Sequence, residues 1–197
     1  FDLLTDDAYY SQPIALRHPI VFYEGHLPAF SFNTLVKRGL HRQPIDDRLE
    51  RLFARGIDPE TEGRERSVRD SWPRREALQA FAAEADRRVI ASLAHADINR
   101  RGDPLLHNAE AAFAILEHEA MHQETLLYMW HRLALDQKRR PEGYRPRVEG
   151  LVPRQAEWID VAPGRATPGV NRDTIPFGGD NGFPSSPTIR TRLPSWS

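Results

Sequence analysis

Two histidines four residues apart are the side chains in this sequence best suited to chemistry. They are His118 and His122, at the ends of the stretch HEAMH. On a helix this spacing places them about 40° apart around the axis and about 6 Å apart along it, so both imidazoles can reach one ion. The letters also match the H-E-x-x-H pattern of zinc proteases, in which the glutamate is the general base. The pair is consistent with a metal enzyme, a protease, or two histidines of a helical core.

The helix face that carries the pair is apolar. At helical spacing before and after the pair lie Ala111, Ala114, Ile115, Thr125, Leu126 and Met129. The two rings should therefore point into the protein, where each unsatisfied polar group costs about 1–3 kcal/mol. Either a metal ion or hydrogen bonds to carboxylates such as Glu119 and Glu124 must satisfy them.

A zinc protease needs a third ligand downstream of the pair. One protease class has a histidine at the position occupied here by Tyr128, and another uses a glutamate about twenty residues further on. Glu142 has that spacing, but it lies among prolines beyond the predicted helix. Such proteases supply this glutamate from a second helix, so the sequence favours a different third ligand.

An upstream histidine is the better third ligand. His26 lies in the stretch RHPIVFYEGHLPAFSFN, two residues before Pro28. A proline inside a helix frees backbone groups and can redirect nearby side chains toward the interior. His18 is a weaker candidate. The histidines expected to face solvent are His41, His95, His107 and His131.

The elements that must position these residues are predicted to be helices. We expect one helix from about Pro19 to Arg38, kinked or split at Pro28, and a short one in DDRLERLFARG, residues 46–56. Two longer helices are expected over 71–102 and 103–136, the second with Asp103 as its N-cap. Residues 58–71 should form a charged loop. This pattern predicts a mainly α, up-and-down four-helix bundle.

The composition changes after the last predicted helix. Residues 141–197 hold 9 of the 16 prolines and 7 of the 12 glycines. We therefore divide the chain into a helical bundle, 1–137, and a Pro/Gly-rich C-terminal extension, 138–197. A short strand is expected in EWIDVAPG, residues 157–164, at the opening of a second domain.

Composition also excludes several functions. The sequence has no cysteine, which excludes disulfides, a cysteine nucleophile and a cysteine-type zinc site. Its 27 basic and 28 acidic residues nearly cancel, so we predict neither nucleic-acid nor membrane-surface binding. No apolar run is long enough for a membrane span, and no signal-peptide pattern opens the sequence. We expect a cytoplasmic protein.

Two stretches resemble the DinB-like domain of the nonheme iron sulfoxide synthases, a family that includes ergothioneine, ovothiol and selenoneine biosynthesis enzymes. They are LRHPIVFYEGHLPAFSFN, residues 16–33, and EHEAMHQETLLYMW, residues 117–130. The resemblance implies that His26, His118 and His122 bind one Fe(II). It further implies small-molecule partners: O2, a thiol or selenol donor, and a histidine derivative such as hercynine. The implied reaction is oxidative C–S or C–Se bond formation.

The resemblance continues into the C-terminal extension. Residues 157–184 are similar to the start of the formylglycine-generating-enzyme-like α/β domain that follows the bundle in these synthases. Gly179, Asp180, Asn181 and Gly182 replace the family's W-D-N-E element. The family's proton-donating tyrosine belongs to that second domain, so no catalytic residue is assigned within these 197 residues.

One position bears on substrate binding. Met121 stands where ergothioneine-type members often have a glutamine that contacts the substrate imidazole, and we expect Met121 to contact substrate instead. DinB-like domains also occur as zinc-dependent thiol transferases. A zinc-binding transferase, or a metal-binding bundle without redox chemistry, is therefore the main alternative function.

Overall fold

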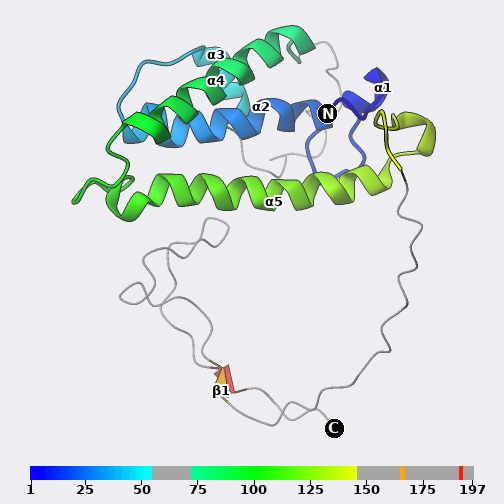
Figure 1. The fold of residues 1–197 in the computed structure, drawn as a ribbon. Helices are drawn as coiled ribbons and strands as arrows, with labels where there is room; N and C mark the ends of the chain where they lie inside the picture. Colours follow the sequence, from blue (N-terminus) through cyan, green and yellow to red (C-terminus); the bar gives the residue numbers. More distant parts are fainter. Residues whose placement is uncertain (55–71, 146–164, 167–190, 193–197) are drawn as a thin grey trace. The chain divides into compact units, whose positions relative to one another are not determined.

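A computed structural model describes residues 1–54, 72–145, 165–166 and 191–192 (Figure 1). The chain divides into two units, Phe1–Arg140 and Pro141–Ser197. The first unit contains the described helices, and the second contains two short antiparallel strands, β1 (Arg165–Ala166) and β2 (Thr191–Arg192). The mainly α fold class is confirmed. The strand expected at 157–164 and the loop expected at 58–71 lie outside the described residues.

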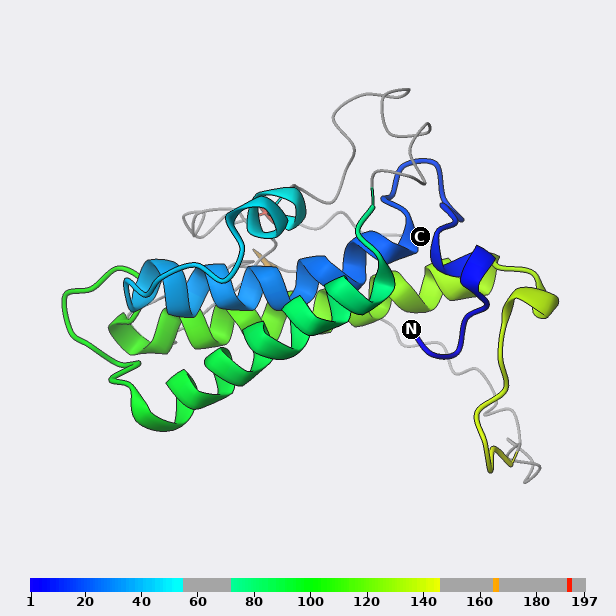
Figure 2. The same cartoon turned by 90° about the horizontal axis from the view of Figure 1, so that it is seen from above.

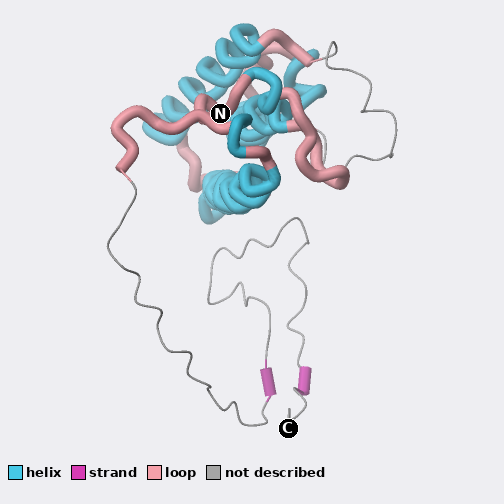
Figure 3. Tube along the Cα trace, turned by 90° about the vertical axis from the view of Figure 1, so that its right-hand side faces the viewer, coloured by secondary structure: helices cyan, strands magenta, loops and turns pink. Residues whose placement is uncertain are grey.

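The central element of the bundle is α2 (Ile20–Ser31), which continues as η1 (Phe32–Gly39). Three further helices pack against it: α3 (Asp47–Phe53), α4 (Arg75–His95) and α5 (Glu110–Arg132). In Figure 2, α4 crosses the other two long helices obliquely. Figure 3 looks along α5 and shows the other helices on one side of it. Short helical turns complete the set: α1 (Asp6–Tyr9), η3 (His107–Ala109) and η4 (Leu135–Gln137).

The apolar core consists of two clusters of buried side chains, one around α2 and one around η1. Its largest fully buried side chains include Tyr9, Phe22, Phe32, Phe53, Leu78 and Met129. Aromatic and aliphatic side chains of this size each contribute roughly 1.5–3 kcal/mol when they leave water. None of the described helices has the length and apolar character needed to cross a membrane.

Of the two outcomes expected at Pro28, a kink or a split, the split does not occur: α2 continues through Pro28 to Ser31. Its hydrogen bonding changes four residues after Pro28, where the wider π-helical turns of η1 begin. The backbone N–H of Phe32 is shared there between the carbonyls of Pro28 and Ala29. Because proline has no N–H to donate, Pro28 removes one α-helical bond, the one that would reach the carbonyl of Glu24.

The two longest helices are shorter than the sequence indicated. Instead of ending near Gly102, α4 ends at His95, because Ala96 is extended and the Asp97 carboxylate accepts a bond from the Asn99 N–H at 3.3 Å. Asp103 does cap a turn, accepting bonds from two N–H groups at 2.9 and 3.2 Å. However, two left-handed residues, Asn108 and Ala109, follow this turn, so α5 begins only at Glu110.

Glycine at position 25 allows α3 to approach α2 closely. A Cβ atom at Gly25 would lie 2.5 Å from the ring of Phe53. No side chain fits at that separation, so the absence of one sets the distance between the two helices. This contact matters because residue 26 carries one of the candidate ligands and Phe53 ends α3.

We predict that Gly25→Ala destabilises the bundle by about 1–3 kcal/mol, because overpacking forces Phe53 to move. Urea unfolding measures the change. Alanine in place of a helical glycine ordinarily stabilises by about 1 kcal/mol, so a gain of that size would contradict the prediction. As a control, combining Gly25→Ala with Phe53→Ala should cost less than the sum of the two single changes.

Candidate metal centre

Three histidines from two helices converge inside the bundle. His26 lies on α2, and His118 and His122 lie on α5. The Nε2 atom of His26 is 3.1 Å from that of His118 and 3.2 Å from that of His122, and the last two are 3.1 Å apart. His26 is 5 % exposed and His122 is fully buried, whereas His118 is half-buried. Among the described residues, these three form a group able to hold a metal ion.

A backbone carbonyl fixes the orientation of His26. Its Nδ1 atom lies 2.7 Å from the carbonyl oxygen of Phe53, the last residue of α3. Because a carbonyl oxygen can only accept, Nδ1 must carry the ring proton. The Nε2 atom therefore presents a lone pair to the other two histidines. A hydrogen bond on the nitrogen remote from the ion is the usual support of a metal-binding histidine.

The triangle of nitrogens cannot be satisfied by hydrogen bonds alone. In a neutral ring, each Nε2 is either a donor or an acceptor. With three atoms in mutual contact, at least one contact must then join two donors or two acceptors. Since the Nε2 of His26 is an acceptor, an ion that receives three lone pairs relieves the conflict completely.

The spacing of the nitrogens fits a first-row metal ion. Two nitrogens bound at about 2.1 Å lie about 3.0 Å apart when the bonds meet at a right angle, and about 3.4 Å apart at the tetrahedral angle. The observed separations of 3.1 and 3.2 Å fall between these values. The triangle therefore accommodates iron or zinc on one face and does not by itself select between them.

Aromatic rings hold the three imidazoles in place. Phe22 stacks on His26 with ring centroids 4.7 Å apart, and Phe30 stacks on His118 at 3.6 Å with planes 10° apart. Tyr23 meets His122 edge-on at 5.4 Å. Phe22, His26 and Phe30 are spaced by four residues and share one face of α2. The four-residue spacing of these rings is visible in the sequence and indicates that they share a helix face with the candidate ligand.

Burial keeps the three rings neutral. Burial is the main cause of a lowered pKa in all three. The pKa of His26 is lowered, that of His118 is lowered to about 3 and that of His122 to about 4. The neighbouring histidines lower the last two further. Neutral imidazole is the form that binds metals, so at neutral pH the site needs no deprotonation before an ion enters.

Glu119 and Glu124 were expected to accept hydrogen bonds from the imidazoles, but the described hydrogen bonds include none between these carboxylates and the three rings. Glu119 accepts a hydrogen bond from Ser31 at 3.4 Å, and burial raises the pKa of Glu119. Glu124 is exposed. The support identified for the site is instead the Phe53 carbonyl, which no side-chain pattern could indicate. The Nδ1 atoms of His118 and His122 are buried without a described hydrogen-bond partner.

The other predicted positions occupy varied environments. Met121 is half-buried, and its carbonyl oxygen and sulfur atom both lie near the Thr125 hydroxyl, at 3.1 and 3.8 Å. His18 is buried but lies outside the triangle, and its ring centroid is 4.1 Å from that of Phe22 with the planes tilted by 31°. Glu142 is exposed beyond α5. The histidines predicted to face solvent are all exposed: His41, His95, His107 and His131.

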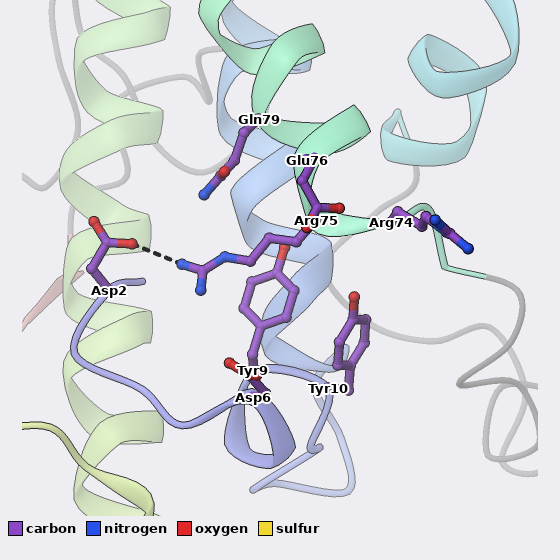
Figure 4. Close-up of a pocket in the computed structure, with 8 residues that line it drawn as sticks. All are labelled: Asp2, Asp6, Tyr9, Tyr10, Arg74, Arg75, Glu76 and Gln79. Atoms are coloured by element: carbon purple, nitrogen blue, oxygen red, sulfur yellow. Dashed lines mark hydrogen bonds and ion pairs between the residues drawn. The ribbon is translucent and has the colours of Figure 1, made fainter.

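A separate polar cavity of about 610 Å³ opens where the N-terminal segment meets the start of α4 (Figure 4). Arg75 donates to Asp2 at 2.8 Å, and its guanidinium lies 4.7 Å from the Tyr9 ring centroid. The Tyr9 hydroxyl donates to Glu24 on α2. These bonds attach the N-terminal segment to α2 and α4. The described lining residues are Asp2, Asp6, Tyr9, Tyr10, Arg74, Arg75, Glu76 and Gln79.

Comparison with known proteins adds independent information. The family model described as "DinB superfamily" matches residues 1–126. A Neurospora crassa protein named "Ergothioneine biosynthesis protein 1" is 31% identical over 133 residues, which cover 64% of this chain and 15% of the relative. A Schizosaccharomyces pombe protein of the same name is 29% identical over 167 residues, covering 82% and 20%. The chain thus spans a fifth or less of these relatives.

Acid should destabilise the metal-free protein. An unfolded histidine has a pKa near 6.5, whereas folded His118 and His122 have values of about 3 and about 4. Between these limits the unfolded state binds more protons, so stability falls as the pH is lowered from about 6.5 toward 4. Urea unfolding of chelator-treated protein across this range measures the slope.

The matched variants are His118→Gln and His131→Gln. The first should flatten the pH dependence, because it removes one ring whose pKa is lowered in the folded protein, and the second should leave it unchanged, because His131 is exposed. Equal slopes in wild type and His118→Gln would refute the assignment of this pH dependence to the triangle.

We further predict that one equivalent of metal binds to the triangle and raises the melting temperature, because ligands that bind only the folded state stabilise it. His26→Ala should remove most of this binding, since it deletes the ligand contributed by α2. His131→Ala is the control on α5 and should bind like wild type. Anaerobic titration with elemental analysis tests both, and full metal retention in His26→Ala would exclude His26 as a ligand.

Proposed function

Because the chain belongs to the DinB superfamily and has ergothioneine biosynthesis proteins as relatives, we propose that it is the metal-binding bundle of an Fe(II)- and O2-dependent C–S bond-forming enzyme. Its substrates would be a thiol or selenol donor and a histidine derivative such as hercynine. The observation that supports this most is the convergence of His26, His118 and His122 in one triangle inside the bundle.

The proposed reaction joins sulfur to a ring carbon of the histidine derivative. A thiol loses its S–H hydrogen and the imidazole loses one C–H hydrogen. Dioxygen supplies one oxygen atom to the sulfoxide product and one to water, accepting four electrons in total. When bound, Fe(II) would supply a redox-active centre at which thiolate and O2 can react.

The protein's own part in this chemistry is to bind and to orient. Three neutral imidazoles would hold the ion without cancelling its charge, which favours capture of an anionic thiolate. The Phe53 carbonyl keeps the Nε2 lone pair of His26 directed toward the other rings. The rings of Phe22 and Phe30 restrict rotation of two ligands and shield them from water on their stacked faces.

A zinc-dependent thiol transferase is the second candidate. The separations between the nitrogens are compatible with zinc as well as with iron, and three protein ligands with one open position are common in catalytic zinc sites. The protease suggested by the HEAMH stretch has less support. The third histidine of the candidate group is His26, upstream of the pair, and the Glu119 carboxylate accepts a bond from Ser31.

The test uses the full-length protein that contains these 197 residues, loaded anaerobically with Fe(II). We predict oxygen uptake that requires both a thiol and hercynine, and a sulfoxide product detected by mass spectrometry. His122→Ala should abolish the uptake, whereas His131→Ala should not.

Metal selection separates the alternatives. Tight zinc binding with thiol transfer, and no substrate-dependent oxygen uptake after iron loading, would favour the transferase and contradict the oxidative function. Zinc-loaded protein should take up no oxygen in either case, because zinc has no redox chemistry.

A further inference from the structure

A buried carboxylate lies in the short helix α3. Glu50 is 1 % exposed, and it is the only carboxylate among the residues that the structure describes as buried. An ionised carboxylate leaves water at a high cost unless hydrogen bonds or an opposite charge compensate it. The contacts of Glu50 provide both kinds of compensation, and they connect α3 to the rest of the bundle.

Glu50 ties α3 to η1 and to the turn that precedes α3. One carboxylate oxygen accepts bonds from the backbone N–H groups of Ile45, at 2.6 Å, and of Asp46, at 3.2 Å. The other oxygen accepts a bond from the ammonium group of Lys37 on η1. Asp46 is itself the N-cap of α3 and accepts two N–H groups of its first turn, at 2.9 Å each. These bonds restrain both the position of α3 along η1 and its rotation about its own axis.

The same helix ends at the candidate metal centre. Phe53 follows Glu50 by three residues, about 4.5 Å along the axis, and its carbonyl accepts the 2.7 Å bond from Nδ1 of His26. The last carbonyls of a helix have no partner within the helix, so this one is available to a side chain. Because α3 has only seven residues, a movement at its start also moves its end.

Packing of the Phe53 ring does not by itself fix where the Phe53 carbonyl lies. The ring meets α2 at Gly25, where a Cβ atom would lie 2.5 Å from it. This contact limits how closely the two helices approach. Apolar contacts are not directional, whereas hydrogen bonds weaken steeply as their angles change. The directional restraint on α3 described here comes from Glu50, one helical turn before the carbonyl.

We propose that Glu50 is a positioning residue for the candidate metal ligand His26, with Lys37 as its counter-charge. By holding α3 against η1, Glu50 keeps the Phe53 carbonyl where it fixes the ring proton of His26 on Nδ1. The Nε2 lone pair then points at His118 and His122. This inference rests on the metal centre of the proposed function and is independent of the reaction proposed there.

The first measurement locates the ring proton without any metal. Nitrogen-15 NMR of the chelator-treated 197-residue chain, labelled at its eight histidines, distinguishes the two neutral tautomers of each ring. The signals of His26 are assigned by their loss in His26→Gln. In wild type the proton of His26 should lie on Nδ1. In Glu50→Ala a second population with the proton on Nε2 should appear, because the acceptor is no longer held in place.

The second measurement is the affinity for zinc(II), which requires no oxygen. Loss of the hydrogen bond that supports a metal-binding histidine weakens metal binding by about 10- to 100-fold. Glu50→Ala displaces this support without deleting it, so a loss of about 10-fold is expected. Glu50→Gln keeps an oxygen for the N–H groups of Ile45 and Asp46 but breaks the bond to Lys37. It should recover affinity to within about threefold of wild type, and Lys37→Met should match it.

Val89→Ala is the matched control for stability. Val89 is a buried residue of α4 in the apolar cluster around η1, and it makes none of the bonds of Glu50. Its truncation should destabilise the bundle, yet leave the His26 tautomer and the zinc affinity of the folded protein unchanged. Circular dichroism and urea unfolding report the folded fraction and the stability of each variant.

The proposal is overturned if Glu50→Ala keeps the wild-type tautomer of His26, or if it weakens zinc binding no more than Val89→Ala does. If Glu50→Ala does not fold, Lys37→Met decides, and an unchanged tautomer and affinity in that variant would reject the role. If wild type binds no zinc, the metal centre fails, and the NMR comparison still decides whether Glu50 positions His26. Absent oxygen uptake would reject only the proposed reaction.

Discussion

The hydrogen bond from Nδ1 of His26 to the Phe53 carbonyl determines what the bundle can bind. It fixes the proton on one nitrogen of the ring and aims the other nitrogen at two histidines of α5. The bond can form only because α3 ends directly against α2, and that approach requires a glycine at position 25. A backbone contact in the core therefore sets the orientation of a side chain in the site. The same contact links stability to binding, since moving α3 would displace the acceptor.

The metal-free site lowers the stability of the bundle, and the same arrangement of imidazoles is already suited to bind an ion. Three imidazoles, two of them buried and that of His118 half-buried, meet at distances at which their neutral forms cannot all be hydrogen-bonded. The Nδ1 atoms of two of them have no described partner. Burial lowers their pKa values, so protonation does not relieve the conflict near neutral pH. An ion can, and the free energy released on binding then contributes to folding. The stacked rings of Phe22 and Phe30 limit how far the imidazoles can turn away from one another.

The sequence indicates which side chains point into the bundle better than it indicates where the helices end. From the four-residue spacing of His118 and His122 and the apolar positions around them, we predicted that both rings point into the bundle; His122 is buried and His118 is half-buried. The HEAMH letters alone pointed equally to a protease, and only the stretch around His26 indicated a ligand from another helix. Helix ends were misplaced where Asp97 and Asn108 favour local turns over continued helix. The Phe53 carbonyl could not be predicted, because a backbone acceptor depends on how helices pack and leaves no pattern of residue types.

The most direct test of the account is X-ray absorption spectroscopy of the protein loaded with one equivalent of Fe(II) under anaerobic conditions. We predict three imidazole nitrogens at about 2.0–2.2 Å, with the multiple-scattering signal typical of histidine rings, and two in His26→Ala. A first shell of oxygen ligands alone, or an unchanged imidazole count in His26→Ala, would contradict the central claim that the triangle of His26, His118 and His122 holds the metal.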